Sequence, residues 1–144
     1  MRRKALVPIV LAVAALVFTA VAAAAVIRGT RGDDNLVGTP NSDLIHGFAG
    51  NDTIVGNGGT DVMFGGPGND NITGDRGNDT INGEDGDDSI NGNLDDDVID
   101  GGPGDDRIQA VGGGVDRIAC GDGLDVVFVD TEDVVAPDCE DVRR

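Results

Sequence analysis

The sequence is short of the side chains from which most globular cores are built. Its 144 residues include no Trp, no Tyr and only four Phe, whereas 24 are Gly. Aromatic side chains usually supply much of the buried apolar area, so a conventional core is not expected. Acidic, Gly-rich chains with few aromatics are usually disordered, and only a regular sequence pattern argues otherwise.

Positive charge is scarce as well. Lys and Arg total 10 against 27 Asp and Glu, which gives a formal net charge of −17. This excess argues against nucleic acid and anionic lipid as partners and favours cations. The chain has one His, His46, and neither an H-E-x-x-H nor a G-x-S-x-G motif. Without a nucleophile and its base, no enzymatic activity is expected.

Cysteine is limited to Cys120 and Cys139. In an exported chain an even pair predicts a disulfide, which would stabilise the fold by roughly 3 kcal/mol for a loop of about 20 residues. Two free thiols and a two-cysteine metal site are the alternatives. The metal site is disfavoured because there is no C-x-x-C spacing and His46 lies far away in sequence.

The first residues differ in composition from the rest. Arg2, Arg3 and Lys4 precede an apolar run that continues to Ile27 and contains four consecutive Ala at 22–25. This arrangement predicts a secretory signal peptide over residues 1–25 and a secreted, extracellular protein with no membrane span after cleavage. An uncleaved membrane anchor is the alternative, because the run is long enough to span a bilayer.

From Gly29 the chain divides without gaps into nine blocks of nine residues: GTRGDDNLV, GTPNSDLIH, GFAGNDTIV, GNGGTDVMF, GGPGNDNIT, GDRGNDTIN, GEDGDDSIN, GNLDDDVID and GGPGDDRIQ. Position one is always Gly and position eight is always apolar. Position six is always Asp: Asp34, Asp43, Asp52, Asp61, Asp70, Asp79, Asp88, Asp97 and Asp106. For a residue that makes up one sixth of the chain, this register has a chance probability of roughly 10⁻⁷. The pattern therefore predicts repeated structure rather than disorder.

Each block predicts a turn followed by a short strand. Gly at positions one and four permits a positive φ or a close backbone approach, and Asn41 and Asp95 replace Gly at position four because they tolerate the left-handed region. Positions seven to nine form a strand whose position eight faces a core. Two blocks make a coil of 18 residues, and stacked coils make a solenoid. The predicted fold class is all-β, a parallel solenoid of the β-helix type over residues 26–109.

Stacking in this way gathers the position-six carboxylates into two columns. Blocks alternate sides, so five Asp residues from Asp34 to Asp106 share one edge and four from Asp43 to Asp97 share the other. Like charges one coil apart are costly unless a cation lies between them, and an all-oxygen site suits Ca²⁺ better than Mg²⁺. Asp could instead serve only as an Asx-turn former, but that role would accept Asn, which never occupies position six. The remaining Asp side chains, such as Asp33, Asp87 and Asp105, are expected to be solvated charges.

The blocks resemble the G-G-x-G-x-D-x-U-x nonapeptide of RTX, or haemolysin-type, calcium-binding proteins. The resemblance implies a parallel β-roll that binds Ca²⁺ between a turn and the turn one coil away. It also implies that position-six carboxylates and main-chain carbonyls of positions one to four are the ligands, with at most about seven ions. Position two is Gly only at Gly66 and Gly102. The departure from the family pattern is acceptable because the residue at position two needs to offer only its main-chain carbonyl. The implied carbonyl residues are Gly47, Gly50, Gly65, Gly66, Gly68, Gly74, Gly77, Gly83, Gly86, Gly101 and Gly104.

Residues 110–144 are predicted to hold two degenerate repeats and a cap. After Gln109 the frame slips by one residue, although Asp116 and Asp125 keep the Asp-x-apolar spacing. A disulfide between Cys120 and Cys139 would pin the tail over the last coil. The sequence thus predicts a monomeric, secreted calcium-binding repeat protein whose folding depends on calcium. A surface-binding, adhesin-like solenoid with an unknown cell-surface or protein partner and an accessory module of a hydrolase system are the alternatives.

Overall fold

The computed structural model describes residues 23–144, so most of the predicted signal peptide lies outside the described residues. All regular structure from residue 23 onward is β-strand. The strands are β1 (Val26–Arg28), β2 (Asn35–Val37), β3 (Leu44–His46), β4 (Thr53–Gly58), β5 (Val62–Phe64), β6 (Asn71–Arg76), β7 (Thr80–Asn82), β8 (Ser89–Leu94), β9 (Val98–Asp100), β10 (Arg107–Ala110), β11 (Arg117–Ala119), β12 (Val126–Val129), β13 (Val134–Val135) and β14 (Asp141–Arg143).

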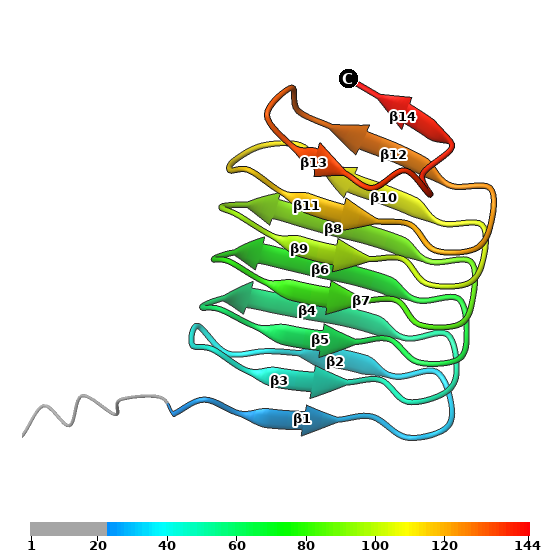
Figure 1. Ribbon diagram of the computed structural model, residues 1–144. Helices are drawn as coiled ribbons and strands as arrows, with labels where there is room; N and C mark the ends of the chain where they lie inside the picture. Colours follow the sequence, from blue (N-terminus) through cyan, green and yellow to red (C-terminus); the bar gives the residue numbers. More distant parts are fainter. Residues whose placement is uncertain (1–22) are drawn as a thin grey trace, which may run out of the picture.

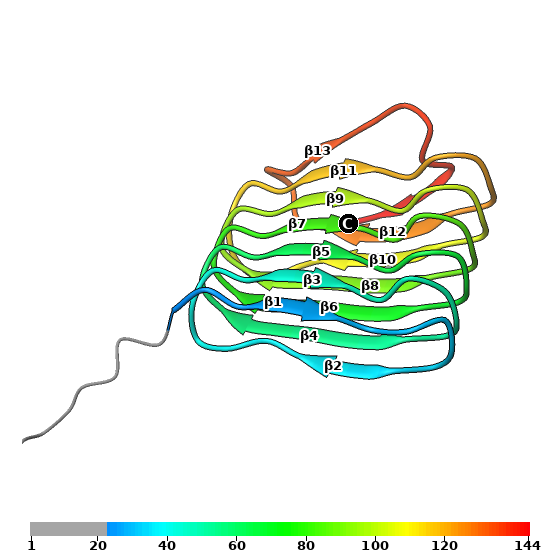
Figure 2. The same ribbon diagram turned by 90° about the horizontal axis from the view of Figure 1, so that it is seen from below.

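The strands form two parallel sheets that face each other across the core (Figures 1 and 2). The odd sheet contains β1, β3, β5, β7, β9, β11 and β13 in that order. The even sheet contains β2, β4, β6, β8, β10, β12 and β14 in that order. The chain passes from one sheet to the other at every turn, so β1 and β14 lie at opposite ends of the stack in Figure 1. The predicted all-β parallel roll is confirmed.

Position eight of each block lines the core. Ile45 is in register with Met63 in the odd sheet, and Ile54 is in register with Ile72 in the even sheet. These four side chains are fully buried. Because a strand alternates faces, the residues on either side of position eight point outward. The core is therefore two ladders of Ile-like side chains, which explains how the chain folds without Trp or Tyr.

Several strands are longer than the three residues predicted. β4, β6 and β8 have six residues each, so they include positions one to three of the following block. Asn57 pairs with Asp75 and Asp75 with Asn93 in these extensions. Stacked coils repeat the turn backbone at the strand spacing, so turn residues can continue the ladder of hydrogen bonds.

Position two has a conformational role that the sequence analysis did not assign to it. Gly66 has φ 114°, but Phe48 (φ 80°) and Glu84 (φ 70°) also lie in the left-handed region. The residue at position two therefore adopts the left-handed conformation that reverses the chain in these turns, in addition to offering a carbonyl. At position four Asp95 has φ 77° as expected, whereas Asn41 does not have a positive φ, so the proposed reason for Asn at that position was wrong.

The C-terminal segment continues both sheets. β11 and β13 extend the odd sheet, and β12 and β14 extend the even sheet. The inserted residue Ala110 lengthens β10 and is fully buried. The predicted disulfide between Cys120 and Cys139 is present, with a Cα–Cα distance of 5.2 Å. In the part of the chain that the structure describes, no helix is long and apolar enough to cross a membrane.

Candidate calcium sites

The nine position-six Asp residues lie in the turns at the two long edges of the solenoid. The first Asp column lies where the chain passes from the odd to the even sheet and contains Asp34, Asp52, Asp70, Asp88 and Asp106. The second Asp column lies at the opposite edge and contains Asp43, Asp61, Asp79 and Asp97. The two columns have the membership that the alternation of blocks predicted. All nine except Asp34 are buried.

In every position-six carboxylate except that of Asp34, Oδ1 accepts a backbone N–H from the preceding coil, which makes a hydrogen-bond ladder along each column. The backbone N–H of Asp52 donates to Oδ1 of Asp70 at 2.7 Å, and that of Asp70 donates to Oδ1 of Asp88 at 2.7 Å. In the second column Asp61 donates in the same way to Asp79 at 2.8 Å. Each Asp thus ties its own coil to the preceding one. This contact would be available to Asn as well, so it does not explain why position six is always Asp.

The second carboxylate oxygen is buried and has no hydrogen-bond partner. This holds for the Oδ2 atoms of Asp52, Asp61, Asp70, Asp79, Asp88, Asp97, Asp106 and Asp125. A buried acceptor without a partner is costly, and a charged one more so. The same unpartnered oxygen therefore recurs at the same turn position along both columns.

Position one is Gly because a side chain there would meet these oxygens. A Cβ atom on Gly65 would overlap Oδ2 of Asp70 and lie 2.7 Å from the carbonyl oxygen of Gly83, one coil along. Gly74 has the same surroundings, with Asp79 Oδ2 and the Gly92 carbonyl. Gly65 and Gly74 have no positive φ, so the need for Gly is a close approach. A carboxylate oxygen and a carbonyl oxygen therefore converge beside each of these position-one Gly residues.

Other turn carbonyls are free to add to this set. Within residues 23–144, no hydrogen bond is formed to the carbonyl oxygens of Gly66 and Gly68, at positions two and four. Gly68 itself has φ 145°, a conformation that favours Gly. The carbonyl residues inferred by resemblance fall at position one (Gly47, Gly65, Gly74, Gly83, Gly101), position two (Gly66) and position four (Gly50, Gly68, Gly77, Gly86, Gly104) of their turns.

When no cation is present, burial raises the pKa of the column carboxylates and so disfavours their ionised form. It raises the pKa of Asp88, Asp97 and Asp106 to about 7, and neighbouring carboxylates add to the rise. The pKa of Asp70 and of Asp79 rises to about 6 for the same reasons. Burial and neighbouring carboxylates both disfavour the charged form, and a bound cation would oppose both effects.

In the first Asp of each column, Oδ2 accepts a hydrogen bond from the residue at position two of its own turn. Thr30 donates its backbone N–H to Oδ2 of Asp34 at 2.5 Å, and Thr39 does the same for Asp43. Burial alone would raise the pKa of Asp43, but the hydrogen bonds from Ala25 and Thr39 outweigh it, so the pKa is lowered. Asp34 and Asp43 thus differ from the other seven, because their Oδ2 atoms already have donors.

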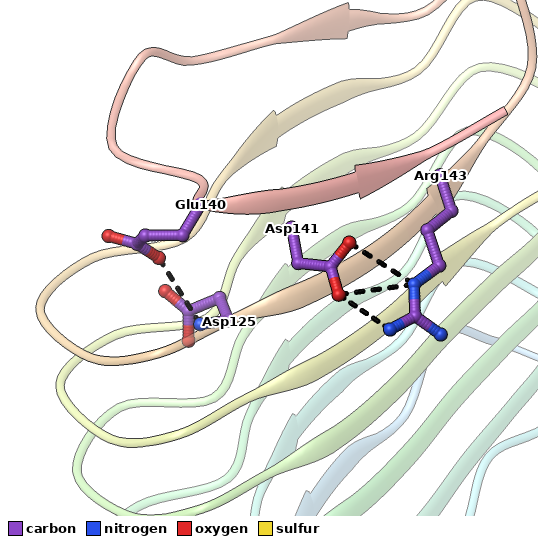
Figure 3. A network of polar contacts seen from close by, with 4 residues as sticks. All are labelled: Asp125, Glu140, Asp141 and Arg143. Atoms are coloured by element: carbon purple, nitrogen blue, oxygen red, sulfur yellow. Dashed lines mark hydrogen bonds and ion pairs between the residues drawn. The ribbon is translucent and has the colours of Figure 1, made fainter.

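Both columns continue past the residues predicted as ligands. Asp97 donates to Asp116 at 2.8 Å and Asp116 to Asp133 at 3.0 Å, while Asp106 donates to Asp125 at 2.8 Å. Glu140 Oε2 then accepts the N–H of Asp125 at 3.2 Å (Figure 3). Asp116, Asp125 and Asp133 are buried like the other column members. The Asp-x-apolar spacing at Asp116 and Asp125 was the signal in the sequence.

A second ladder follows position five of the first edge. Oδ1 of Asp33 accepts the N–H of Asn51 at 2.8 Å, and Oδ1 of Asp87 accepts that of Asp105 at 3.0 Å. These side chains are exposed, as expected for solvated charges, but they also join neighbouring coils. Position five tolerates both Asn and Asp because a single acceptor oxygen is enough.

The donor set suits a hard cation held by one or two carboxylates and several carbonyls. Among the described residues, no three His, Cys, Asp or Glu side chains converge on a common point, so backbone oxygens must complete any site. Irregular sites of carboxylate and carbonyl oxygens are typical of Ca²⁺, whereas Zn²⁺ prefers Cys and His. The unpartnered Oδ2 atoms and the space left by Gly at position one both fit Ca²⁺.

Comparison with known proteins agrees with this geometry. No curated protein matches the chain. The family model for the RTX calcium-binding nonapeptide repeat matches four times, over residues 28–63, 64–99, 83–113 and 92–127. Together these matches cover more than half of the chain, and they include both Asp columns. The protein therefore belongs to the family of RTX calcium-binding nonapeptide repeat proteins.

Proposed function

We propose that this chain is an exported calcium-binding protein whose turns hold Ca²⁺ between successive coils and whose folding depends on that calcium. The observation that carries the proposal is the series of buried Oδ2 atoms without partners, which runs from Asp52 to Asp106 in the first column and from Asp61 to Asp97 in the second. RTX repeats bind calcium, and proteins that contain them are typically secreted. The predicted signal peptide over residues 1–25 supports the same destination.

Each proposed site lies between a turn and the turn one coil along. The Oδ2 atom of a position-six Asp and the position-one carbonyl of the next coil would be ligands, and free carbonyls at positions two and four would complete the shell. When bound, the ion would neutralise the buried carboxylates and join two coils at their edge. Because an unfolded chain has no such site, its binding free energy would add to the stability of the fold.

The ladder contacts favour a structural over a catalytic role. Oδ1 of every position-six Asp except Asp34 accepts a backbone N–H, for example that of Asp70 from Asp52, so the carboxylate is fixed in position. Its Oδ2 lies beneath the next coil and away from solvent. A general acid or base must reach a substrate, and these oxygens do not.

Circular dichroism during a calcium titration tests this function. We expect little strand signal in excess chelator and a cooperative gain of strand signal at millimolar Ca²⁺. Magnesium at the same concentration should be much less effective, because it keeps its water ligands. A strand signal that is unchanged by chelator, together with no calcium detected by calorimetry, would refute the proposal.

A surface-binding role is a second candidate, and the outer face of the odd sheet favours it. Its position-seven residues are mostly apolar and several are exposed: Val26 (61%), Leu44 (41%), Val98 (45%) and Val134 (56%). In the even sheet the same position holds Asn35, Thr53, Asn71 and Ser89. At one end of the odd sheet His46 stacks on Phe48, with ring centroids 4.1 Å apart. Exposed apolar patches of this kind often mark interaction sites.

Cell-binding assays separate this candidate from a solely structural role. Calcium-loaded protein would be mixed with cells of the organism that produces it, and the fraction of protein that sediments with the cells would be measured. Leu44→Asp on the odd sheet should reduce that fraction, whereas Asn71→Asp on the even sheet should not. Equal sedimentation of the two variants would exclude the odd sheet as the binding face.

A further inference from the structure

The chain contains three Asn-Gly pairs, a sequence that is prone to spontaneous deamidation: Asn57-Gly58, Asn82-Gly83 and Asn91-Gly92. In this reaction the backbone nitrogen of the Gly attacks Cγ of the Asn side chain, and Gly favours the attack because it has no Cβ to hinder it. The nitrogen must be free of a hydrogen bond, and water must reach the Asn side chain. The three pairs differ in both respects.

The backbone nitrogens of Gly83 and Gly92 belong to the ladders between coils. Gly83, at position one of its turn, donates its N–H to the Asp100 carbonyl at 2.9 Å. Gly92 also occupies position one and lies inside β8, and both Gly residues are buried. The Asn82 side chain is held as well, because its Oδ1 accepts the N–H of Glu84 at 3.0 Å. In the folded protein these two pairs are therefore not free to react.

The N–H of Gly58 has no such partner. Gly58 is in register with Arg76 of β6, and the N–H of the next residue, Gly59, donates to the Arg76 carbonyl at 3.1 Å. Because successive N–H groups of a strand point to opposite sides, the N–H of Gly58 points away from β6, toward the turn 38–43. Within residues 23–144 the pairing of β2 with β4 ends before this point, and no hydrogen bond joins the Gly58 nitrogen to that turn.

Position three, which Gly58 occupies, is a place where the fold does not require an N–H. Pro occupies it in three other blocks, as Pro40, Pro67 and Pro103, and Pro has no N–H to donate. Asn57 itself is exposed and lines a groove on the surface. The Asn57-Gly58 pair thus combines a free backbone nitrogen with a side chain that water reaches.

Asn57 also belongs to a row in which amides and a carboxylate alternate. It is in register with Asp75, and Asp75 is in register with Asn93, whose Nδ2 donates to Oδ1 of Asp75 at 3.3 Å. Nδ2 of Asn57 donates to the Gly38 carbonyl at 2.8 Å. A carboxylate in place of the Asn57 amide would lose this donor and would place two like charges opposite each other, which destabilises neighbouring strands.

We propose that Asn57 is a site of spontaneous deamidation in the folded protein and that the ladders protect Asn82 and Asn91. The Gly58 nitrogen loses its proton to hydroxide and forms a bond to Cγ of Asn57. The Cγ–Nδ2 bond then breaks, and ammonia leaves with a proton taken from water. Water opens the resulting succinimide ring at either carbonyl, which leaves an aspartate or an isoaspartate at this position. The inference goes beyond the proposed function, because it needs the folded turns but no particular ligand.

Peptide mapping by mass spectrometry after incubation in a mildly alkaline buffer tests the site. The calcium-loaded protein would be compared with the same protein in concentrated urea. In the folded protein Asn57 should deamidate at least about tenfold faster than Asn82 or Asn91, because amides in a ladder react only when the structure opens locally. In urea the three rates should be similar. Equal rates in the folded protein, or the same excess at Asn57 in urea, would overturn the proposal.

Gly58→Ala is the matched control for the attacking nitrogen. The nearest atom to its Cβ is 3.7 Å away and its φ is not positive, so the fold should be unchanged. We expect deamidation of Asn57 to slow at least about fivefold, because a Cβ hinders the approach of the nitrogen. An unchanged rate in this variant would show that the Gly58 nitrogen is not the attacking group and would refute the mechanism.

The effect on stability is measured separately. Asn57→Asp introduces the charge without the reaction, so its thermal unfolding temperature should be lower than that of wild type. Prolonged incubation should lower the unfolding temperature of wild type more than that of Gly58→Ala. An unfolding temperature that is the same for Asn57→Asp and wild type would contradict the role given to the Asn57 amide in its row.

Discussion

The backbone N–H of Asp70 donates a hydrogen bond to Oδ1 of Asp88 at 2.7 Å, while Oδ2 of Asp88 is buried without a partner. The two oxygens of one carboxylate therefore have different roles. The first joins neighbouring coils, and the second is left without a partner for its buried charge, which is costly. This division recurs from Asp52 to Asp106 in the first column and from Asp61 to Asp97 in the second, so the ladder of hydrogen bonds is accompanied there by a row of unpartnered carboxylate oxygens.

Asp88→Asn should have opposite effects on the metal-free and calcium-loaded protein. Asn keeps the Oδ1 acceptor and removes the buried charge, so the metal-free fold should be stabilised by about 1–3 kcal/mol. Calcium binding should weaken at least about tenfold at the adjacent sites, because a charged ligand is lost. The strand signal in excess chelator, measured by circular dichroism, reports the first effect, and a calcium titration reports the second. Asp87→Asn, an exposed neighbour, is the control, and an equal response from the two variants would contradict this assignment of Asp88.

Without calcium, the protein should become more stable as the pH is lowered from about 7 to about 4. The pKa of Asp88, Asp97 and Asp106 is raised from 3.8 to about 7, so the folded state binds more protons than the unfolded state in this range. Stability is therefore present at low pH and is lost as the pH rises through the folded pKa. Circular dichroism in calcium-free buffer at several pH values measures this change. A strand signal that rises with pH would show that the carboxylates are not buried in the metal-free state.

Gly65→Ala should disrupt one turn and its ion. The new Cβ would overlap Asp70 Oδ2 and press on the Gly83 carbonyl, so we expect a loss of about 2–4 kcal/mol and of one bound calcium. Gly58→Ala is the matched control, because the nearest atom to its Cβ is 3.7 Å away and its φ is not positive. Thermal unfolding in saturating Ca²⁺ compares them. Similar unfolding temperatures would mean that the absence of a side chain at position one is not required for the stability of the turn.

Ile81→Ala tests the core between the sheets. Ile81 is buried within the odd sheet, so its truncation should cost about 2–5 kcal/mol. Thr80→Ala changes the adjacent, outward-facing residue and should stay within about 0.5 kcal/mol. Both values come from denaturation of the calcium-loaded protein. Comparable losses at the two positions would show that the register differs from that of the structure.

The architecture was predictable because the period of the repeat equals the period of the structure. With Asp at position six of every block, alternate blocks must place Asp34 and Asp52 on one edge and Asp43 on the other, and Ile at position eight must face inward. The extended columns were less visible, because the insertion before Asp116 shifts the frame. The contacts of Thr30 with Asp34 and Thr39 with Asp43 were not predicted, since a Thr at position two carries no signal by itself.

The sequence alone determined the solenoid, the two Asp columns and the inward Ile ladders, because each follows from spacing along the chain. For Cys120 and Cys139 it predicted a disulfide but left free thiols and a metal site as alternatives, and the structure contains the disulfide. Tertiary structure decided which oxygen of each carboxylate has a partner and which does not. It also decided that the column extends to Asp125 and that Phe48 adopts a left-handed φ. These features depend on contacts with the coil above or below, and the distance and direction of such contacts are set only when the coils are stacked.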